Sequence, residues 1–146
     1  MFMRMFLPAL VGLMMIPTAL LAGEGEDTPL VRQIAASPNR DVFETARWNE
    51  PIELASAGDA AEYFEADQLA ALNAAVDWEQ EAVLVFAWRG SGGDRMTAQT
   101  DADNPDTVRF LYTRGLTRDL RPHVYVFVLK QGVVWEVEAQ RPGRGR

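Results

Sequence analysis

Two uninterrupted apolar runs constrain the fold of this chain more than any other feature. Val83–Trp88 and Val124–Leu129 carry an apolar or aromatic side chain at every position. Successive side chains of a strand point to opposite faces of its sheet, so each run predicts a central strand that is covered on both faces. Apolar side chains recur at every second position in three later segments, namely Met96 and Ala98, then Val108, Phe110 and Tyr112, then Val133, Trp135 and Val137. We therefore expect an antiparallel sheet of five or more strands.

A helical segment is predicted before the first apolar run. Ser56 followed by Asp59 forms an acidic variant of the capping box. The alanine-rich sequence that follows can place six apolar side chains on one stripe, namely Ala60, Tyr63, Phe64, Leu69, Leu72 and Val76. Asp67 can cap a second helical piece. The fold class is therefore α+β, with a helical segment at about 57–76 packed on one face of the sheet.

Three shorter segments complete the predicted domain at 41–139. The β-forming residues of Val42–Trp48 predict a first strand, and Pro51–Ala55 predicts a second strand at a sheet edge. These strands could cover part of the second sheet face. Gln131-Gly132 is typical of a two-residue hairpin turn.

The N-terminus has the pattern of a secretory signal. Arg4 precedes the apolar stretch Met5–Ala22, and an acidic run, Gly23–Asp27, follows it. We expect residues 1–22 to be a signal peptide and the mature protein to be periplasmic or extracellular, without stable membrane insertion. An uncleaved membrane anchor is the alternative. Residues 23–40 are expected to form a mobile leader, and residues 140–146 a disordered tail.

The absence of cysteine and the acidic net charge exclude several classes of function. The chain has no cysteine, which excludes disulfides, thiol nucleophiles and cysteine-ligated zinc. Its net charge is −7, but the charge is uneven. Residues 24–81 hold 14 acidic and 3 basic side chains, whereas residues 82–146 hold 7 acidic and 10 basic ones. A chain this acidic is not expected to bind nucleic acid.

The loop at Gly90–Asp94 is the first candidate for a function. Glycine-rich loops that bind phosphate lead into a helix, but a strand is predicted here. A hairpin turn whose glycines need positive φ is the structural explanation. Ser91 and Asp94 are retained as candidate binding residues.

The connection at residues 112–123 is the second candidate. It holds Arg114, Arg118 and Arg121 together with His123, the single histidine of the chain. Arginine forks suit carboxylates and phosphates in a ligand or a partner protein. The alternative is that Asp119 pairs with one of the arginines and pins the loop. We also expect the two apolar runs to be antiparallel, which would bring Asp94 into an ion pair with Arg118 or Arg121.

Catalysis and metal binding are two alternatives to ligand binding. Ser91, Asp119 and His123 occur in the order found in α/β-hydrolases, which makes a small hydrolase an alternative function. Residues 101–106 partly match a calcium loop, but proline replaces a ligand, and a hairpin connection explains them. No cofactor and no metal are expected.

The residues also carry a family resemblance. The step Val76-Asp77-Trp78, the strand that ends at Trp88, the loop Gly90–Asp94 and the block Gly115–His123 resemble a group of short secreted bacterial proteins of unknown function. More distantly, residues 50–138 are similar to the C-terminal domain of PrcB-like protease-complex-stabilising proteins. That family has an aromatic residue where this chain has Asp94. The resemblance implies an exported accessory domain and no catalyst.

The sequence therefore predicts a non-enzymatic, exported domain. It would bind an envelope protein or an anionic small ligand through the 114–123 loop and the Gly90–Asp94 turn. A structural envelope component is the remaining alternative.

Overall fold

Two sheets and three short helices make up residues 29–141, which are the residues that the computed structural model describes. The first sheet has the order β1-β6-β3-β2, with bounds Val31–Ile34, Arg121–Lys130, Glu81–Gly90 and Ile52–Leu54. The second has the order β4-β5-β7, with bounds Arg95–Thr100, Thr107–Thr113 and Val134–Gln140. The helices are α1 (Val42–Thr45), α2 (Ala57–Ala60) and α3 (Ala66–Ala75).

The two apolar runs form the central strands of the first sheet. β3 and β6 pair antiparallel over their whole length, from Glu81 opposite Lys130 to Gly90 opposite Arg121. The expected opposite sense of the two runs is therefore confirmed. Val83–Trp88 in β3 and residues 126–129 in β6 are buried on both faces, as their continuous apolar sequence predicts, whereas Val124 and Tyr125 are half-buried.

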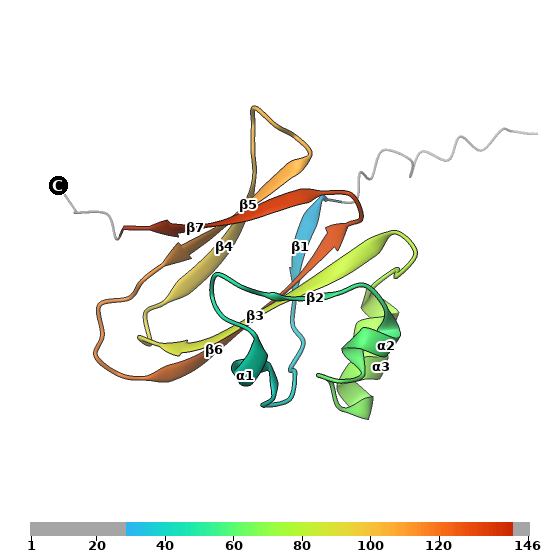
Figure 1. The fold of residues 1–146 in the computed structure, drawn as a ribbon, viewed down its shortest axis with the longest axis horizontal. Coiled ribbons are helices and arrows are strands. Elements are labelled where there is room, and N and C mark those ends of the chain that lie inside the picture. Colours follow the sequence, from blue (N-terminus) through green and yellow to red (C-terminus); the bar gives the residue numbers. More distant parts are fainter. Residues whose placement is uncertain (1–28, 142–146) are drawn as a thin grey trace, which may run out of the picture.

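Different layers cover the two faces of this sheet (Figure 1). One face packs against the helical side through Val83, Val85, Ala87, Val126 and Val128. The other face packs against the second sheet through Leu84, Phe86, Trp88, Phe127 and Leu129. The helical cover is confirmed. The single sheet of five or more strands is wrong, because β4, β5 and β7 form a separate sheet that covers the second face.

The second sheet consists of β4, β5 and β7. β4 and β5 form an antiparallel hairpin, and residues 101–106 are its connection, as expected. β7 then pairs with β5 in parallel, with Val134 beside Thr107 and Gln140 beside Thr113. Gly132 has a φ of 81°, as a tight turn after β6 requires. The expected hairpin at this turn is wrong, because β6 and β7 belong to different sheets.

The N-terminal part differs most from expectation. Residues 31–34 lie in the expected mobile leader, yet they form β1 on the edge of β6. Arg32 anchors this strand through an ion pair with the buried Glu81 and a hydrogen bond to the carbonyl of Ala75. Residues 42–45 form α1 instead of a strand. β2 is an edge strand beside β3, as predicted.

The predicted helical segment consists of two helices. Ser56 caps α2, since its side chain accepts the backbone N–H of Asp59 at 3.2 Å. α3 begins after Glu65, so the expected cap at Asp67 is wrong. The predicted apolar stripe is confirmed, because all six of its residues belong to or pack against the core between helices and sheet.

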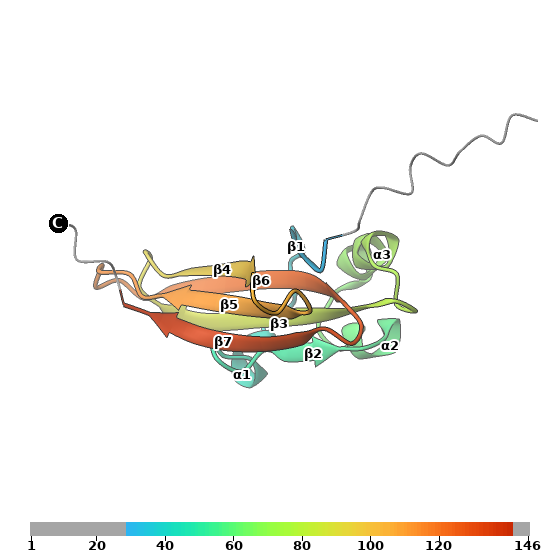
Figure 2. The same cartoon turned by 90° about the horizontal axis from the view of Figure 1, so that it is seen from above.

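The long strands β3 and β6 run between two opposite ends of the fold. α2 and α3 lie at one end, whereas the connection of residues 114–120 lies at the other (Figure 2). The predicted signal peptide at 1–22, the first residues of the leader and residues 142–146 of the tail are outside the described residues. Within residues 29–141, no helix has the length and apolar character needed to span a membrane.

Candidate functional site

The two candidate loops meet at one corner of the molecule. Residues 91–94 carry the chain from β3 to β4, and residues 114–120 carry it from β5 back to β6. The backbones touch at two glycines, because a Cβ on Gly115 would lie 2.4 Å from the carbonyl carbon of Gly93. Gly90, Gly92 and Gly93 all lack a positive φ, so the expectation of positive φ in the Gly90–Gly93 loop is wrong. Gly93 and Gly115 permit close approach of two backbones.

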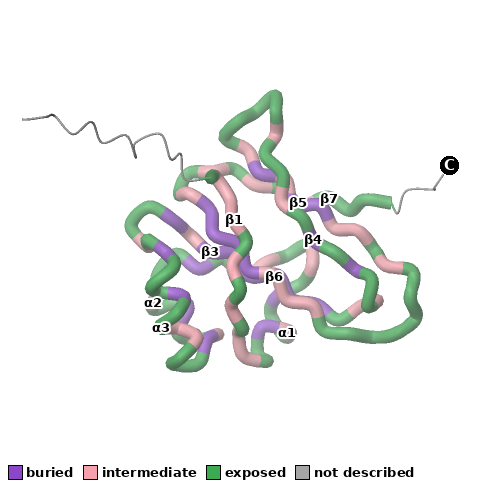
Figure 3. Tube along the Cα trace, turned by 180° about the vertical axis from the view of Figure 1, so that it is seen from behind, coloured by how far each residue is buried: buried purple, intermediate pink, exposed green. Residues whose placement is uncertain are grey.

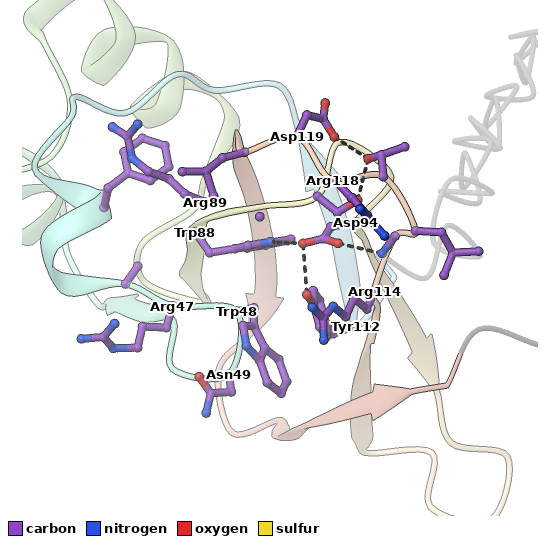
Figure 4. A pocket seen from close by; sticks show the side chains of 18 residues that line it. Arg47, Trp48, Asn49, Trp88, Arg89, Asp94, Tyr112, Arg114, Arg118 and Asp119 are labelled. Carbon is purple, nitrogen blue, oxygen red and sulfur yellow. Dashed lines mark hydrogen bonds between the residues drawn. The ribbon is translucent and has the colours of Figure 1, made fainter.

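Asp94 is the centre of this corner (Figure 4). It is buried, with 3% of its surface exposed. Its Oδ2 accepts the indole N–H of Trp88 and the hydroxyl of Tyr112, both at 3.0 Å. Its Oδ1 accepts the backbone N–H of Gly115 at 2.7 Å. One carboxylate therefore ties together the end of β3, the end of β5 and the start of the 114–120 loop.

The hydrogen bonds keep this buried carboxylate ionised. Burial raises the pKa of Asp94, but the N–H of Gly115, the indole and the phenol outweigh burial, so the pKa lies below its usual value. Burial and the adjacent Asp94 in turn raise the pKa of Tyr112 to about 12. The expected ion pair with Arg118 or Arg121 is wrong. Neutral donors, rather than arginines, satisfy the Asp94 carboxylate.

Asp119 makes a second attachment between the loops. Its Oδ1 accepts the backbone N–H of Gly92 at 3.0 Å and the hydroxyl of Thr117, while its Oδ2 pairs with Arg121. These bonds, from Thr117 first and then from Gly92 and Arg121, lower the pKa of Asp119 well below its usual range. Ser91 adds a hydroxyl contact of 2.7 Å to Thr117. The internal pairing that sequence reasoning offered as the alternative role of Asp119 is thus present.

Ser91, Asp119 and His123 lie at the same corner but do not form a Ser–His–Asp triad. His123 contacts the backbone carbonyl of Ser91 at 2.7 Å through Nε2, while the Ser91 hydroxyl contacts Thr117. Asp119 is bonded to Gly92, Thr117 and Arg121. A triad needs the imidazole to reach the serine hydroxyl and the carboxylate to orient the imidazole. Neither contact is among the hydrogen bonds of residues 29–141.

A groove of about 1230 Å³ opens beside this corner. The 43–49 segment, which includes the end of α1, lies on one side and the 114–120 loop on the other (Figure 4). Trp88, Asp94 and Tyr112 line it between these sides. Trp48 stacks on Tyr112, with ring centroids 4.4 Å apart. Most of the 114–120 loop is exposed (Figure 3).

Four arginines line the groove: Arg47, Arg89, Arg114 and Arg118. Among the described residues, none of the four has a carboxylate oxygen within 4.0 Å, whereas Arg32, Arg109 and Arg121 all do. Arg89 lies 5.2 Å from the ring centroid of Phe43. Of the two carboxylates of the groove, Asp119 pairs with Arg121, whereas Asp94 keeps its negative charge among neutral donors. The four arginines outnumber these carboxylates, so the lining of the groove has an excess of positive charge.

The structure brings most of the sequence-predicted residues together. Ser91, Asp94, Arg114, Arg118 and Asp119 line the groove, while Arg121 and His123 support the corner through Asp119 and Ser91. Sequence reasoning missed the opposite side, with Phe43, Arg47, Trp48 and Asn49, and also Arg89. The pair Arg47-Trp48 combines a cation with an aromatic ring, which was the one available signal. The β-forming residues of this segment predict a strand, and this obscures the place of Arg47-Trp48 in the site.

No family model, curated protein or solved structure matches this chain.

Proposed function

We propose that this protein is an exported, non-enzymatic domain that binds an anionic group of another molecule in the arginine-lined groove. The observation that carries the proposal is that Arg47, Arg89, Arg114 and Arg118 all line one groove without carboxylate partners among the described residues. Guanidinium groups stay charged at any working pH and bind carboxylates or phosphates through paired N–H donors.

Two further features support the proposal. First, the 114–120 loop is bonded to the 91–94 corner at three points, so its arginines are attached to a fixed backbone before any ligand binds. Such preorganisation lowers the entropy that binding must overcome. Second, the chain as a whole is acidic, so a positive groove is a local exception that favours one kind of partner. The family resemblance to exported accessory proteins points in the same direction.

The experiment compares two double variants with the same change of charge. Arg114→Gln with Arg118→Gln removes two groove cations. Arg40→Gln with Arg95→Gln removes two exposed cations outside the groove. Binding to poly-glutamate is measured by titration calorimetry at several salt concentrations.

We expect salt-dependent binding that the groove variant weakens by about tenfold or more, since two charge-assisted hydrogen bonds are lost. The control variant should bind nearly as the parent does. Equal weakening in both variants would show a general charge effect, and absence of any binding would remove the proposed function.

A further inference from the structure

The 114–120 loop has a two-residue period in its contacts. Gly115 donates its N–H to Asp94, Thr117 contacts the hydroxyl of Ser91, and Asp119 accepts the N–H of Gly92. Every second residue of the loop is therefore bonded to the 91–94 corner. The residues between them are Arg114, Leu116, Arg118 and Leu120. Their side chains make no hydrogen bond or ion pair with any described residue.

The intervening residues form a row of alternating charge and apolarity. All four line the groove. Leu116 is 85% exposed and Leu120 is 73% exposed, which makes them the two most exposed large apolar side chains in residues 29–141. Burial of a leucine side chain in a complex is favourable, so two exposed leucines beside unpaired arginines indicate a surface that a partner covers. We call this set of four residues the Arg-Leu row.

The backbone of this loop suits recognition of an extended chain. Residues 114–120 contain no helix, strand or turn. In an extended chain, side chains two residues apart are separated by about 6.6 Å, and the same spacing occurs in any extended partner. A partner with the same period can therefore place one side chain against each member of the row.

We propose that the groove binds an extended segment of a partner protein in which acidic and apolar side chains alternate at every second residue. The acidic residues pair with Arg114 and Arg118, and the apolar ones cover Leu116 and Leu120. This inference rests on the proposed function and adds the chemical class of the partner. Charge complementarity selects the acidic residues, and the exposed leucines select the apolar ones.

The opposite side and the size of the groove favour a peptide over a small anion. Phe43 and Trp48 add apolar surface across from the row, which a phosphate or a simple carboxylate cannot use. The volume of about 1230 Å³ exceeds the 300–1,000 Å³ that is usual for small-molecule pockets. A seven-residue extended segment is about 20 Å long and has as many residues as the 114–120 loop.

The test measures the fluorescence anisotropy of four labelled peptides of the same length with the purified protein. ETLTETL has the proposed period, and EELLTTT has the same composition without the period. KTLTKTL reverses the charge, and ETSTETS replaces the apolar residues by serine. We expect ETLTETL to bind at least about tenfold more tightly than EELLTTT, and KTLTKTL not to bind. Poly-glutamate is measured in parallel.

Two variants assign the effect to the row. Arg114→Glu with Arg118→Glu should lose ETLTETL and gain KTLTKTL, a reversal that misfolding cannot produce. Leu116→Ser with Leu120→Ser should remove the preference for ETLTETL over ETSTETS while the circular dichroism spectrum stays unchanged.

The outcomes separate the two proposals. Binding of poly-glutamate with equal affinity for ETLTETL and EELLTTT would overturn this inference and leave the proposed function intact. Failure of poly-glutamate and all peptides to bind would remove both proposals. Binding to phosphatidylglycerol vesicles or to inorganic phosphate in place of ETLTETL would also overturn the inference, because the partner would then be a lipid or a small anion.

Discussion

The carboxylate of Asp94 accepts the indole N–H of Trp88 at 3.0 Å, and this bond spans the point where the chain leaves the first sheet for the second. Trp88 belongs to the face of the first sheet that packs on the second one. Because the same carboxylate also holds Gly115, a single buried charge links the contact between the sheets to the position of the arginine-bearing loop.

Asp94→Asn should therefore destabilise the protein strongly. Asn has one acceptor oxygen, whereas Asp94 receives three donors on two oxygens, so the amide NH₂ must face at least one of them. We expect a loss of about 2–3 kcal/mol in the free energy of unfolding, measured by urea denaturation. Asp106→Asn, at an exposed position, is the matched control and should change stability by less than about 0.5 kcal/mol. Equal losses would contradict the assigned role of Asp94.

A glycine-to-alanine pair tests the contact between the two backbones. In Gly115→Ala the new methyl group would meet backbone atoms of Gly93 at 2.4–2.5 Å, so the loops must separate. We expect a destabilisation of about 1–3 kcal/mol and weaker binding in the groove. In Gly58→Ala, within α2, the nearest atom is 3.6 Å away, and the lower flexibility of alanine should stabilise the protein by about 0.4–1 kcal/mol. Thermal melts of both variants give the comparison, and a neutral Gly115→Ala would contradict the close contact.

The alkaline limb of the stability curve should depend on Tyr112. Its pKa is raised from 10.0 to about 12 in the folded protein, so the folded state retains a proton that the unfolded state releases. The stabilising contribution is complete below pH 10 and is lost as the pH rises toward 12. Tyr112→Phe should flatten this loss, and urea denaturation at several alkaline pH values measures it. The ultraviolet absorbance of tyrosinate gives an independent reading, since one tyrosine should ionise later than a free tyrosine. A Tyr112→Phe variant with the same alkaline slope as the parent would show that another group is responsible.

The sequence was informative where a pattern is local. Continuous apolarity in Val83–Trp88 and Val124–Leu129 predicts two-sided burial, because every side chain of a strand must face one layer or the other. The same pattern does not say which layer covers each face. The layer that covers the second face depends on the parallel pairing of β5 with β7. These two strands are far apart in the sequence, because the whole of β6 lies between them. The expectation of a single sheet failed for that reason.

The candidate site was predictable in its residue types but not in its pairing. The cluster of Arg114, Arg118 and Arg121 predicted a binding loop, and Arg114 and Arg118 line the groove. Asp94 was expected to pair with an arginine because charge is visible in a sequence, whereas burial beside Trp88 and Tyr112 is not. The contribution of residues 43–49 to the groove could not be predicted, because the β-forming residues of Val42–Trp48 predict a strand where the structure has α1.

The register of β7 has a practical consequence for anyone who labels this protein. Gln140 lies beside Thr113, one residue before Arg114, so cargo fused after residue 141 would be tethered next to the groove. Leu30 bonds to Lys130, at the far end of β6 from Arg121. A fluorophore or affinity handle placed ahead of residue 29 would therefore lie away from the groove, while an acidic tag fused after residue 141 would compete for the groove at a high local concentration.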